Sequence, residues 1–143
     1  MYQILITSLA AGVIAQLSKL FVKSNKIKIS WRAVSSYAGM PSSHAAFVVS
    51  LTTIIGLTQG FSSPLFAVCL IFSVLVIRDA LGVRRYLGQH GEIINILVRD
   101  LKEDKMLDES YPQLLEKIGH TPAQIIAGSL LGIIVSLISF FLL

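Results

Sequence analysis

The sequence predicts an all-α integral membrane protein, a helical bundle of about four transmembrane helices in a single domain over residues 1–143. Three observations predict this class. The chain is 54% hydrophobic and only 14% charged, with a mean hydropathy of +0.74, which is too apolar for an ordinary soluble domain of this size. All Lys, Arg, Asp and Glu residues lie in two windows, residues 19–32 and 78–117. The remaining stretches have the length that crosses a bilayer, roughly 20 residues of helix.

The four spans are predicted at about residues 2–20, 41–59, 62–77 and 122–143. Gly60 and Pro64 interrupt the apolar run between the second and third spans, which predicts a tight helical hairpin there. Between the third and fourth spans, a cytoplasmic amphipathic or loop segment is expected. Apolar residues recur at helical spacing from Tyr86 to Leu101, which predicts an amphipathic helix along the membrane surface. The mixed-charge residues 100–109 that follow predict a solvated loop without ligands.

The distribution of Lys and Arg predicts the orientation in the membrane. The turn between the second and third spans carries no charge, whereas the connection from the first to the second carries only basic residues, namely Lys19, Lys23, Lys26, Lys28 and Arg32. We therefore expect both termini outside and both charged connections in the cytoplasm. The first segment lacks a basic region before its apolar run, so it is interpreted as an uncleaved anchor. Cys69 is the single cysteine and can form no internal disulfide.

Two predicted helix starts have the composition of an anion site. The second span is preceded by the run Gly39, Met40, Pro41, Ser42, Ser43, His44, and the fourth by Gly119, His120, Thr121, Pro122, Ala123, Gln124. Proline fits the first turn, Ser and Thr cap, and the free backbone N–H groups attract negative charge. Because both spans start from the cytoplasmic face, the two histidines can meet there. Arg84, Arg85 and His90 follow the third span into the same region.

Three strings carry a family resemblance: GMPSSH from Gly39, RDALGVRR from Arg78 and GHTPAQIIAG from Gly119. In this order, among four spans, they resemble the divergent PAP2 family, the group labelled acid phosphatase/vanadium-dependent haloperoxidase-related. The resemblance implies a membrane relative of the type 2 phosphatidic acid phosphatases, with a histidine nucleophile and neither metal nor cofactor. The expected function is hydrolysis of a lipid phosphomonoester, because helix starts at the headgroup level suit a substrate whose tails stay in the bilayer. The cytoplasmic position favours lipids made on that leaflet, such as phosphatidylglycerol phosphate or phosphatidic acid. The resemblance also implies a bacterial plasma membrane or a plastid membrane.

Carried over by position, the resemblance implies that His120 is the nucleophile and that His44 protonates the leaving oxygen. The family aspartate four residues after the nucleophile is Gln124 here, and the arginine six residues before it is Leu114. Because Arg84 and His90 have that six-residue spacing, His90 is a competing candidate nucleophile. The implied phosphate-binding residues are Ser42, Ser43, Arg84, Arg85, Thr121 and Lys19, with Lys23 as an alternative to Lys19.

Structural readings of the same residues stay open. Thr121 and Gln124 have the spacing of a capping box, which would only close a helix. Arg78 and Asp79 are interpreted as a neighbouring charge pair that ends the third span, with a structural role for Asp79, and Arg84 and Arg85 could bind anionic headgroups without catalysis.

Other functions and partners follow from the same residues. The alternative function is non-hydrolytic binding or transport of a lipid phosphate such as a prenyl phosphate, which Gln124 and Leu114 favour. A third reading is a structural membrane subunit, which leaves the paired histidine motifs unexplained. The expected partners are the lipid bilayer and a lipid phosphate substrate, without nucleic acid. The small-residue pairs allow close helix approach, within the chain or in a homodimer; they are Gly56 with Gly60 and Gly128 with Gly132.

Overall fold

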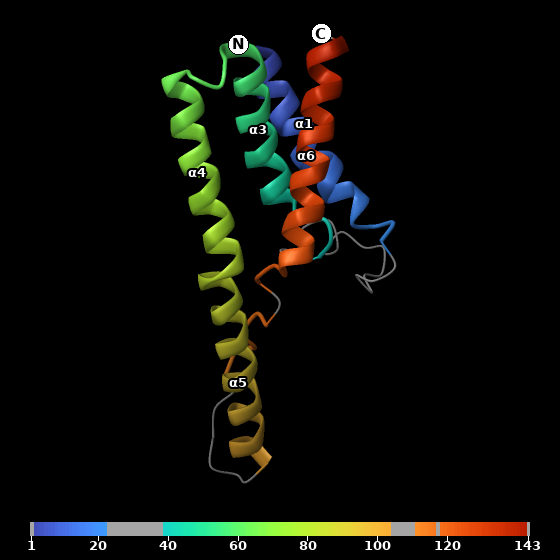
Figure 1. Ribbon diagram of the computed structural model, residues 1–143. Coiled ribbons are helices and arrows are strands. Elements are labelled where there is room, and N and C mark those ends of the chain that lie inside the picture. Colours follow the sequence, from blue (N-terminus) through green and yellow to red (C-terminus); the bar gives the residue numbers. More distant parts are fainter. Residues whose placement is uncertain (1, 23–38, 104–110, 117, 143) are drawn as a thin grey trace.

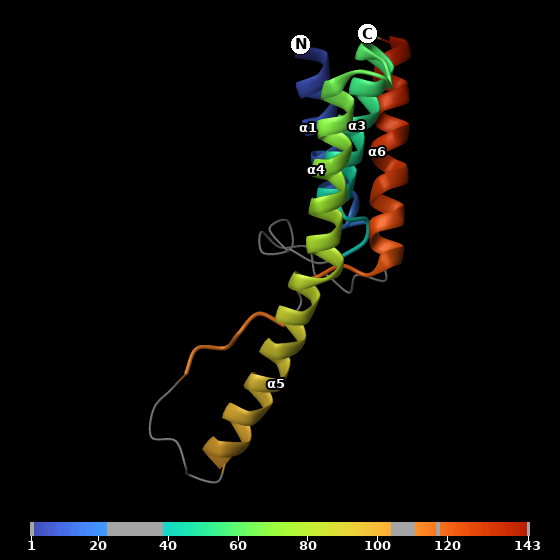
Figure 2. The same cartoon turned by 60° about the vertical axis from the view of Figure 1, so that its left-hand side comes forward.

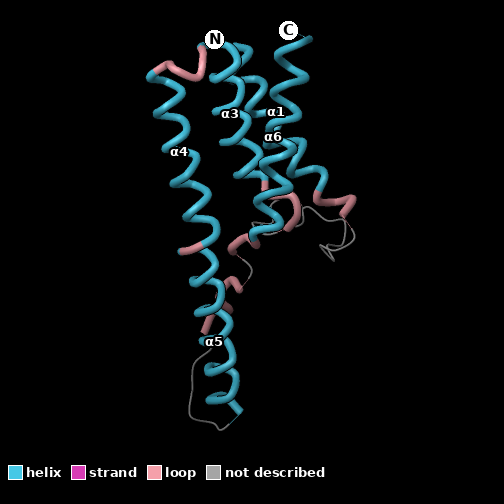
Figure 3. Tube along the Cα trace, in the orientation of Figure 1, coloured by secondary structure: helices cyan, strands magenta, loops and turns pink. Residues whose placement is uncertain are grey.

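The computed structural model describes residues 2–22, 39–103, 111–116 and 118–142. These residues form five helices and no strand, so the predicted all-α class is confirmed (Figure 3). The helices are α1 (Tyr2–Ser18), α3 (Ser43–Gln59), α4 (Pro64–Leu81), α5 (Val83–Glu103) and α6 (Pro122–Leu142).

Four of the helices, α1, α3, α4 and α6, lie side by side in a bundle (Figures 1 and 2). Helix α3 is central, because it packs against each of the other three. Both termini lie at one end of the bundle, together with the turn between α3 and α4 (Figure 1). Helix α5 continues from α4 beyond the opposite end (Figure 2). The segments that lead into α3 and α6, which carry the two histidine motifs, also lie at that opposite end.

Polar side chains lie inside the bundle and large apolar side chains lie outside, the reverse of the arrangement in a soluble protein. Hydroxyl groups lie between the helices: Ser50 bonds to Ser136 at 2.8 Å and Thr52 to Ser73 at 2.7 Å. Large apolar side chains cover the outside, including Val68 at 63% and Ile134 at 54% exposure. Buried small and hydroxyl residues with an apolar exterior are typical of helices packed in lipid, where polar side chains link helices and small residues let backbones approach.

The lengths of the helices bear on how many cross the membrane. By length and composition, α6 and the continuous helix formed by α4 and α5 can span a bilayer. Helices α1 and α3 are apolar and have 17 residues each. The count of four spans therefore stays a prediction, although four helices of the bundle occupy the four predicted segments.

The helix boundaries differ slightly from the predicted spans. The third predicted span ended at residue 77, but α4 continues through Arg78 and Asp79 to Leu81 and stops only at Gly82. Charged side chains in the last turn do not break the helix. The apolar stretch therefore ends at residue 77, before the helix itself ends at Leu81. The predicted hairpin is confirmed, since Gly60 has a φ of +90° and its carbonyl accepts from the Ser63 N–H at 3.1 Å.

The segment between α4 and α6 contains the predicted amphipathic helix. Helix α5 continues from α4 and runs away from the bundle, whereas the predicted helix along the membrane surface would lie across the end of the bundle; the chain then returns along α5 (Figure 2). Asn95 fixes the return, because its amide donates to the Leu114 carbonyl and accepts from the Leu114 N–H, both at 2.9 Å. The predicted loop over residues 100–109 starts too early, because its residues 100–103 form the last turn of α5. Its residues 104–109, and the basic residues Lys23, Lys26, Lys28 and Arg32, lie outside the described residues.

Helices α3 and α6 approach each other closely at two glycines of α6. A Cβ on Gly128 would collide with the Ser42 carbonyl, and one on Gly132 would lie 2.5 Å from the Ala46 carbonyl oxygen. In the described chain these two glycines therefore serve internal packing, which was one of the two readings of their spacing. The contact also fixes the start of α3 against the first turns of α6.

We expect Gly128→Ala to destabilise the bundle by about 1–3 kcal/mol, the usual cost of overpacking. The reason is that the new methyl group meets backbone, which cannot rotate away. The matched control is Gly12→Ala in α1, where a Cβ would lie at an ordinary 3.5 Å from the Phe47 side chain. Thermal unfolding in detergent measures both variants. Equal unfolding temperatures for the two would contradict this packing.

Candidate functional site

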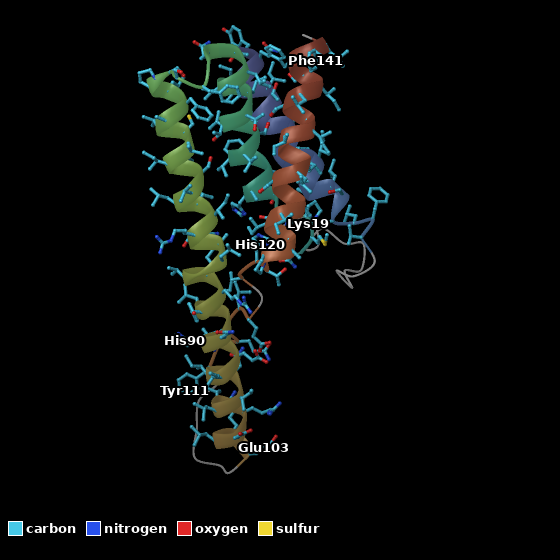
Figure 4. All side chains as sticks on the ribbon, viewed as in Figure 1. Lys19, His90, Glu103, Tyr111, His120 and Phe141 are labelled. Atoms are coloured by element: carbon cyan, nitrogen blue, oxygen red, sulfur yellow. The ribbon has the colours of Figure 1, made fainter. Side chains whose placement is uncertain are left out.

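His44 and His120 meet at the end of the bundle opposite the termini. Their ring centroids are 6.2 Å apart and their planes are tilted by 58°. Two backbone hydrogen bonds hold the motifs together: the Ser42 N–H donates to the Gln124 carbonyl at 3.0 Å, and the His120 N–H donates to the Ala80 carbonyl at 3.1 Å. The site is therefore formed where the start of α3, the end of α4 and the start of α6 converge (Figure 4).

The side chain of Gln124 determines the tautomer of His120. The Thr121 backbone N–H donates to Gln124 Oε1 at 3.0 Å, which identifies that atom as the oxygen of the amide. The same oxygen lies 3.2 Å from His120 Nδ1, so Nδ1 must carry the proton and donate it. The neutral ring then has its lone pair on Nε2. Among the described residues, Nε2 is buried and has no hydrogen-bond partner.

Burial keeps the His120 ring neutral. The residue is only 2% exposed, and this burial lowers the pKa of His120 from its ordinary value of 6.5. The hydrogen bond to Gln124 opposes the shift, and the positive charges of Lys19 and Arg84 add to it. At neutral pH the ring therefore presents an unprotonated Nε2, which is the form that a nucleophile or a proton acceptor requires.

Two cations border the histidine pair. Lys19 follows the last residue of α1, is 1% exposed, and has its pKa lowered by desolvation to about 8 (Figure 4). It remains protonated at neutral pH. Arg84, at the start of α5, forms an ion pair through Nε with Asp79, for which the sequence had predicted Arg78 as the partner. The guanidinium has further N–H donors beyond Nε, so the pair with Asp79 leaves it able to bind a second anion.

The other predicted residues have distinct positions. Ser42 is fully buried and its hydroxyl caps α3 by accepting from the Ala45 N–H at 3.3 Å. Ser43 is half-buried beside His44. Thr121 caps α6: its hydroxyl accepts from the Gln124 N–H at 3.4 Å, which confirms the predicted capping box. His90 is exposed on α5, well away from His120 in Figure 4, so the structure does not bring it to the histidine pair.

Arg85 belongs to a polar pocket on the α5 side of His120. The pocket has a volume of about 270 Å³. Its lining comprises Arg85, Gln89, Glu92, Glu116, Gly119, His120, Thr121 and Gln124. The buried imidazole of His120 therefore lies in the wall of this pocket. The described residues contain no group of three or more His, Cys, Asp or Glu side chains that could hold a metal ion.

Sequence reasoning missed the residues that position His120. Gly88 and Gly91 of α5 lie against the backbone carbonyls of Glu116 and Leu115, where a side chain would collide. Gly119 lies against the backbone of Arg85 in the same way, with a would-be Cβ 2.5 Å from Arg85 Cα. Together with Asn95, the glycines of α5 let the backbone of residues 114–116 pack directly against α5, just before the chain reaches His120. In the sequence, two glycines on one face of an amphipathic helix could have indicated that another segment packs closely there.

A bundle with an apolar exterior and a cation-bordered pair of histidines at one end defines a helical membrane protein with a polar site at its end. The chain belongs to the Divergent PAP2 family, whose sequence model matches residues 1–135, so the resemblance carried by the three motifs is confirmed. It is also 39% identical, over 94% of its length and 91% of the relative, to the "Uncharacterized membrane protein YuiD" of Bacillus subtilis (strain 168). No solved structure matches it.

Proposed function

We propose that the protein is a lipid phosphate phosphatase that cleaves a phosphomonoester headgroup through His120. The observation that carries this proposal is the hydrogen-bond chain from Thr121 through Gln124 to His120, which leaves Nε2 unprotonated, buried and next to His44. Membership of the Divergent PAP2 family supports it. Phosphatidylglycerol phosphate and phosphatidic acid are the proposed substrates, because the site lies at the end of an apolar bundle where headgroups would lie.

The reaction has two steps. His120 Nε2 attacks phosphorus, the P–N bond forms and the P–O ester bond breaks, while His44 donates a proton to the departing alkoxide. Water then attacks the phosphohistidine: the new P–O bond forms, the P–N bond to His120 Nε2 breaks and returns its electron pair to the ring, His44 takes up the proton of the water, and inorganic phosphate leaves. The ring centroids of His44 and His120 are 6.2 Å apart, and this proximity supports a phosphate bound between the two rings. Lys19 and Arg84 neutralise its charge.

The proposed location is a bacterial plasma membrane with the site on the cytoplasmic side. Both termini lie at the end opposite the site, so they would be outside (Figure 1). The basic residues that follow α1 support this orientation under the positive-inside rule.

A second candidate function is binding or transport of a lipid phosphate without hydrolysis. The observation that favours it is that Gln124, an uncharged amide, orients His120 where a carboxylate would stabilise imidazolium more strongly. In addition, Asp79 offsets part of the charge of Arg84. This candidate predicts headgroup binding that survives the loss of His120.

Phosphate release distinguishes the two functions. Purified protein in nanodiscs is incubated, without added metal, with phosphatidylglycerol phosphate, phosphatidic acid or a prenyl diphosphate, and inorganic phosphate is measured. Release from one of these lipids supports the phosphatase and identifies its substrate. Binding of all three without release would replace the phosphatase with the carrier.

The pKa of Lys19 predicts how lipid binding depends on pH. Affinity for a non-hydrolysable lipid phosphonate should fall as the pH rises through about 8, because Lys19 loses its proton there. The expected loss is roughly 10-fold, the value of one charge-assisted hydrogen bond. In Lys19→Arg the decrease should disappear, since a guanidinium stays protonated. The control is Lys102→Arg, the same exchange at the exposed end of α5. An unchanged decrease in Lys19→Arg contradicts the assignment.

A further inference from the structure

An apolar groove runs along α3 between α1 and α4, and His44 forms part of its wall. The groove has a volume of about 480 Å³. Leu9, Val13 and Phe72 on its rim are 50%, 56% and 50% exposed, so it opens onto the apolar exterior of the bundle. Its full lining comprises Leu9, Gly12, Val13, Gln16, Ser43, His44, Phe47, Val48, Phe72 and Val76.

The polarity of the groove changes along its length. Its polar lining residues, Gln16, Ser43 and His44, lie at the end of α1 and the start of α3, next to the histidine pair. Every other lining residue is apolar or glycine. From Gln16 back to Leu9 the groove follows seven residues of α1, or roughly 10 Å at 1.5 Å per residue. One end is therefore at the site and the other is well inside the apolar part of the bundle.

We propose that this groove holds a hydrocarbon chain of the lipid phosphate whose headgroup lies between His44 and His120. The inference rests on the proposed function and adds a binding site for the lipid chain to it. The chemistry of the occupant follows from the two ends. The apolar part suits a hydrocarbon chain, and the cations Lys19 and Arg84 beyond His44 suit an anion attached to that chain.

The arrangement explains why His44 is the proton donor. The ester oxygen joins the phosphate to the lipid, so it lies where the groove meets the site. His44 lines the groove and faces His120 across 6.2 Å, so it borders the junction at which the P–O bond breaks. His120 approaches from the opposite side, where its neighbours line the polar pocket that would supply water.

The groove contributes to positioning more than to affinity. A hydrocarbon chain leaves an equally apolar bilayer to enter it, so little hydrophobic free energy is gained. Holding the chain instead restricts the headgroup to a reactive geometry, and misplacement by about 1 Å can cost roughly 100-fold in rate. Blocking the groove should therefore lower kcat for lipids.

The test fills the groove and compares two classes of substrate. A Cβ on Gly12 would lie 3.5 Å from Phe47 and Val13 lies on the rim, so Gly12→Leu and Val13→Trp place bulk in the groove. The matched control is Ile14→Trp, since Ile14 is 45% exposed but does not line the groove. Substrates are dioleoyl phosphatidic acid, a prenyl phosphate and glycerol 3-phosphate, which has no chain.

We expect both groove variants to lower the rate of lipid hydrolysis roughly 10- to 100-fold. Their hydrolysis of glycerol 3-phosphate should stay unchanged, and Ile14→Trp should hydrolyse the lipids at the wild-type rate. A diacyl lipid and a prenyl lipid that respond differently identify the chain that the groove accepts. An equal loss with glycerol 3-phosphate, or the same loss in Ile14→Trp, overturns the proposal.

A second readout does not depend on hydrolysis. Phosphatidic acid with a diazirine at mid-chain is photolysed with wild-type and Val13→Trp protein in nanodiscs, and the labelled peptides are identified. The expected labels lie on residues 9–16 of α1 and on Phe72 of α4, and they are lost in Val13→Trp. Such labelling without any phosphate release would contradict the proposed hydrolysis but still support a binding site for the hydrocarbon chain. Labelling spread evenly over all apolar faces would overturn the chain site even if phosphate is released.

Discussion

Replacing His120 with asparagine is expected to reduce phosphate release to background, a loss of about 10⁴-fold or more, because it removes the only proposed nucleophile. His44→Ala should cost roughly 10²- to 10⁴-fold through loss of the proton donor. The physical basis is the pair itself: two imidazoles 6.2 Å apart, one of them with its lone pair fixed on Nε2. Phosphate release from the purified variants measures both effects.

The control for these variants is His90→Ala. His90 has the six-residue spacing from Arg84 that made it a competing nucleophile, but it is exposed on α5. Its replacement should leave phosphate release unchanged. If His90→Ala abolished release while His120→Asn did not, the nucleophile would be His90 and the convergence of the two histidine motifs would be only structural.

Replacing Gln124 should have the second largest effect, with opposite consequences for two substitutions. Gln124→Leu removes the acceptor for His120 Nδ1–H and for the Thr121 N–H, so the tautomer is no longer fixed. We expect roughly a 100-fold loss of kcat, the scale of misplacing a reacting group. Gln124→Glu keeps both hydrogen bonds and adds a negative charge, which raises the pKa of His120.

The pH profile distinguishes these effects. His120 reacts as the neutral ring, and burial lowers its pKa, so in the wild type the acid-side decline of kcat/KM should lie below pH 6.5. The alkaline decline is separate, because there His44 loses the proton that it donates. In Gln124→Glu the acid-side decline should move to higher pH, because protonation now sets in earlier. Gln59→Leu, the same exchange at the far end of α3, serves as the control for Gln124→Leu. An unchanged profile in Gln124→Glu would mean that Gln124 only closes α6.

The fold was largely predictable from the sequence because the apolar runs and the turn residues act locally. Gly60 and Pro64 are sufficient to predict the hairpin, and Thr121 with Gln124 predicts the start of α6. The end of α4 was predicted too early, because hydropathy drops at Arg78 while helical hydrogen bonding continues to Gly82.

The candidate site was predictable only in part. The convergence of His44 and His120 followed from the shared direction of α3 and α6, but the contacts that bring them together are long-range and carry little sequence signal. Examples are the Ser42 N–H bonded to the Gln124 carbonyl and the close approach at Gly128. Lys19 was a weak candidate in the sequence, whereas its burial beside the histidines depends on how α1 packs on α3.

The most direct test of the account is to trap the covalent intermediate. Purified protein is mixed with phosphatidic acid or phosphatidylglycerol phosphate, denatured rapidly in alkali, in which phosphohistidine survives, and analysed by peptide mass spectrometry. Phosphate is expected on His120; it should be absent from His120→Asn and still form in His90→Ala. Phosphate on His90, or steady release of inorganic phosphate with no modified histidine at any time, would contradict it.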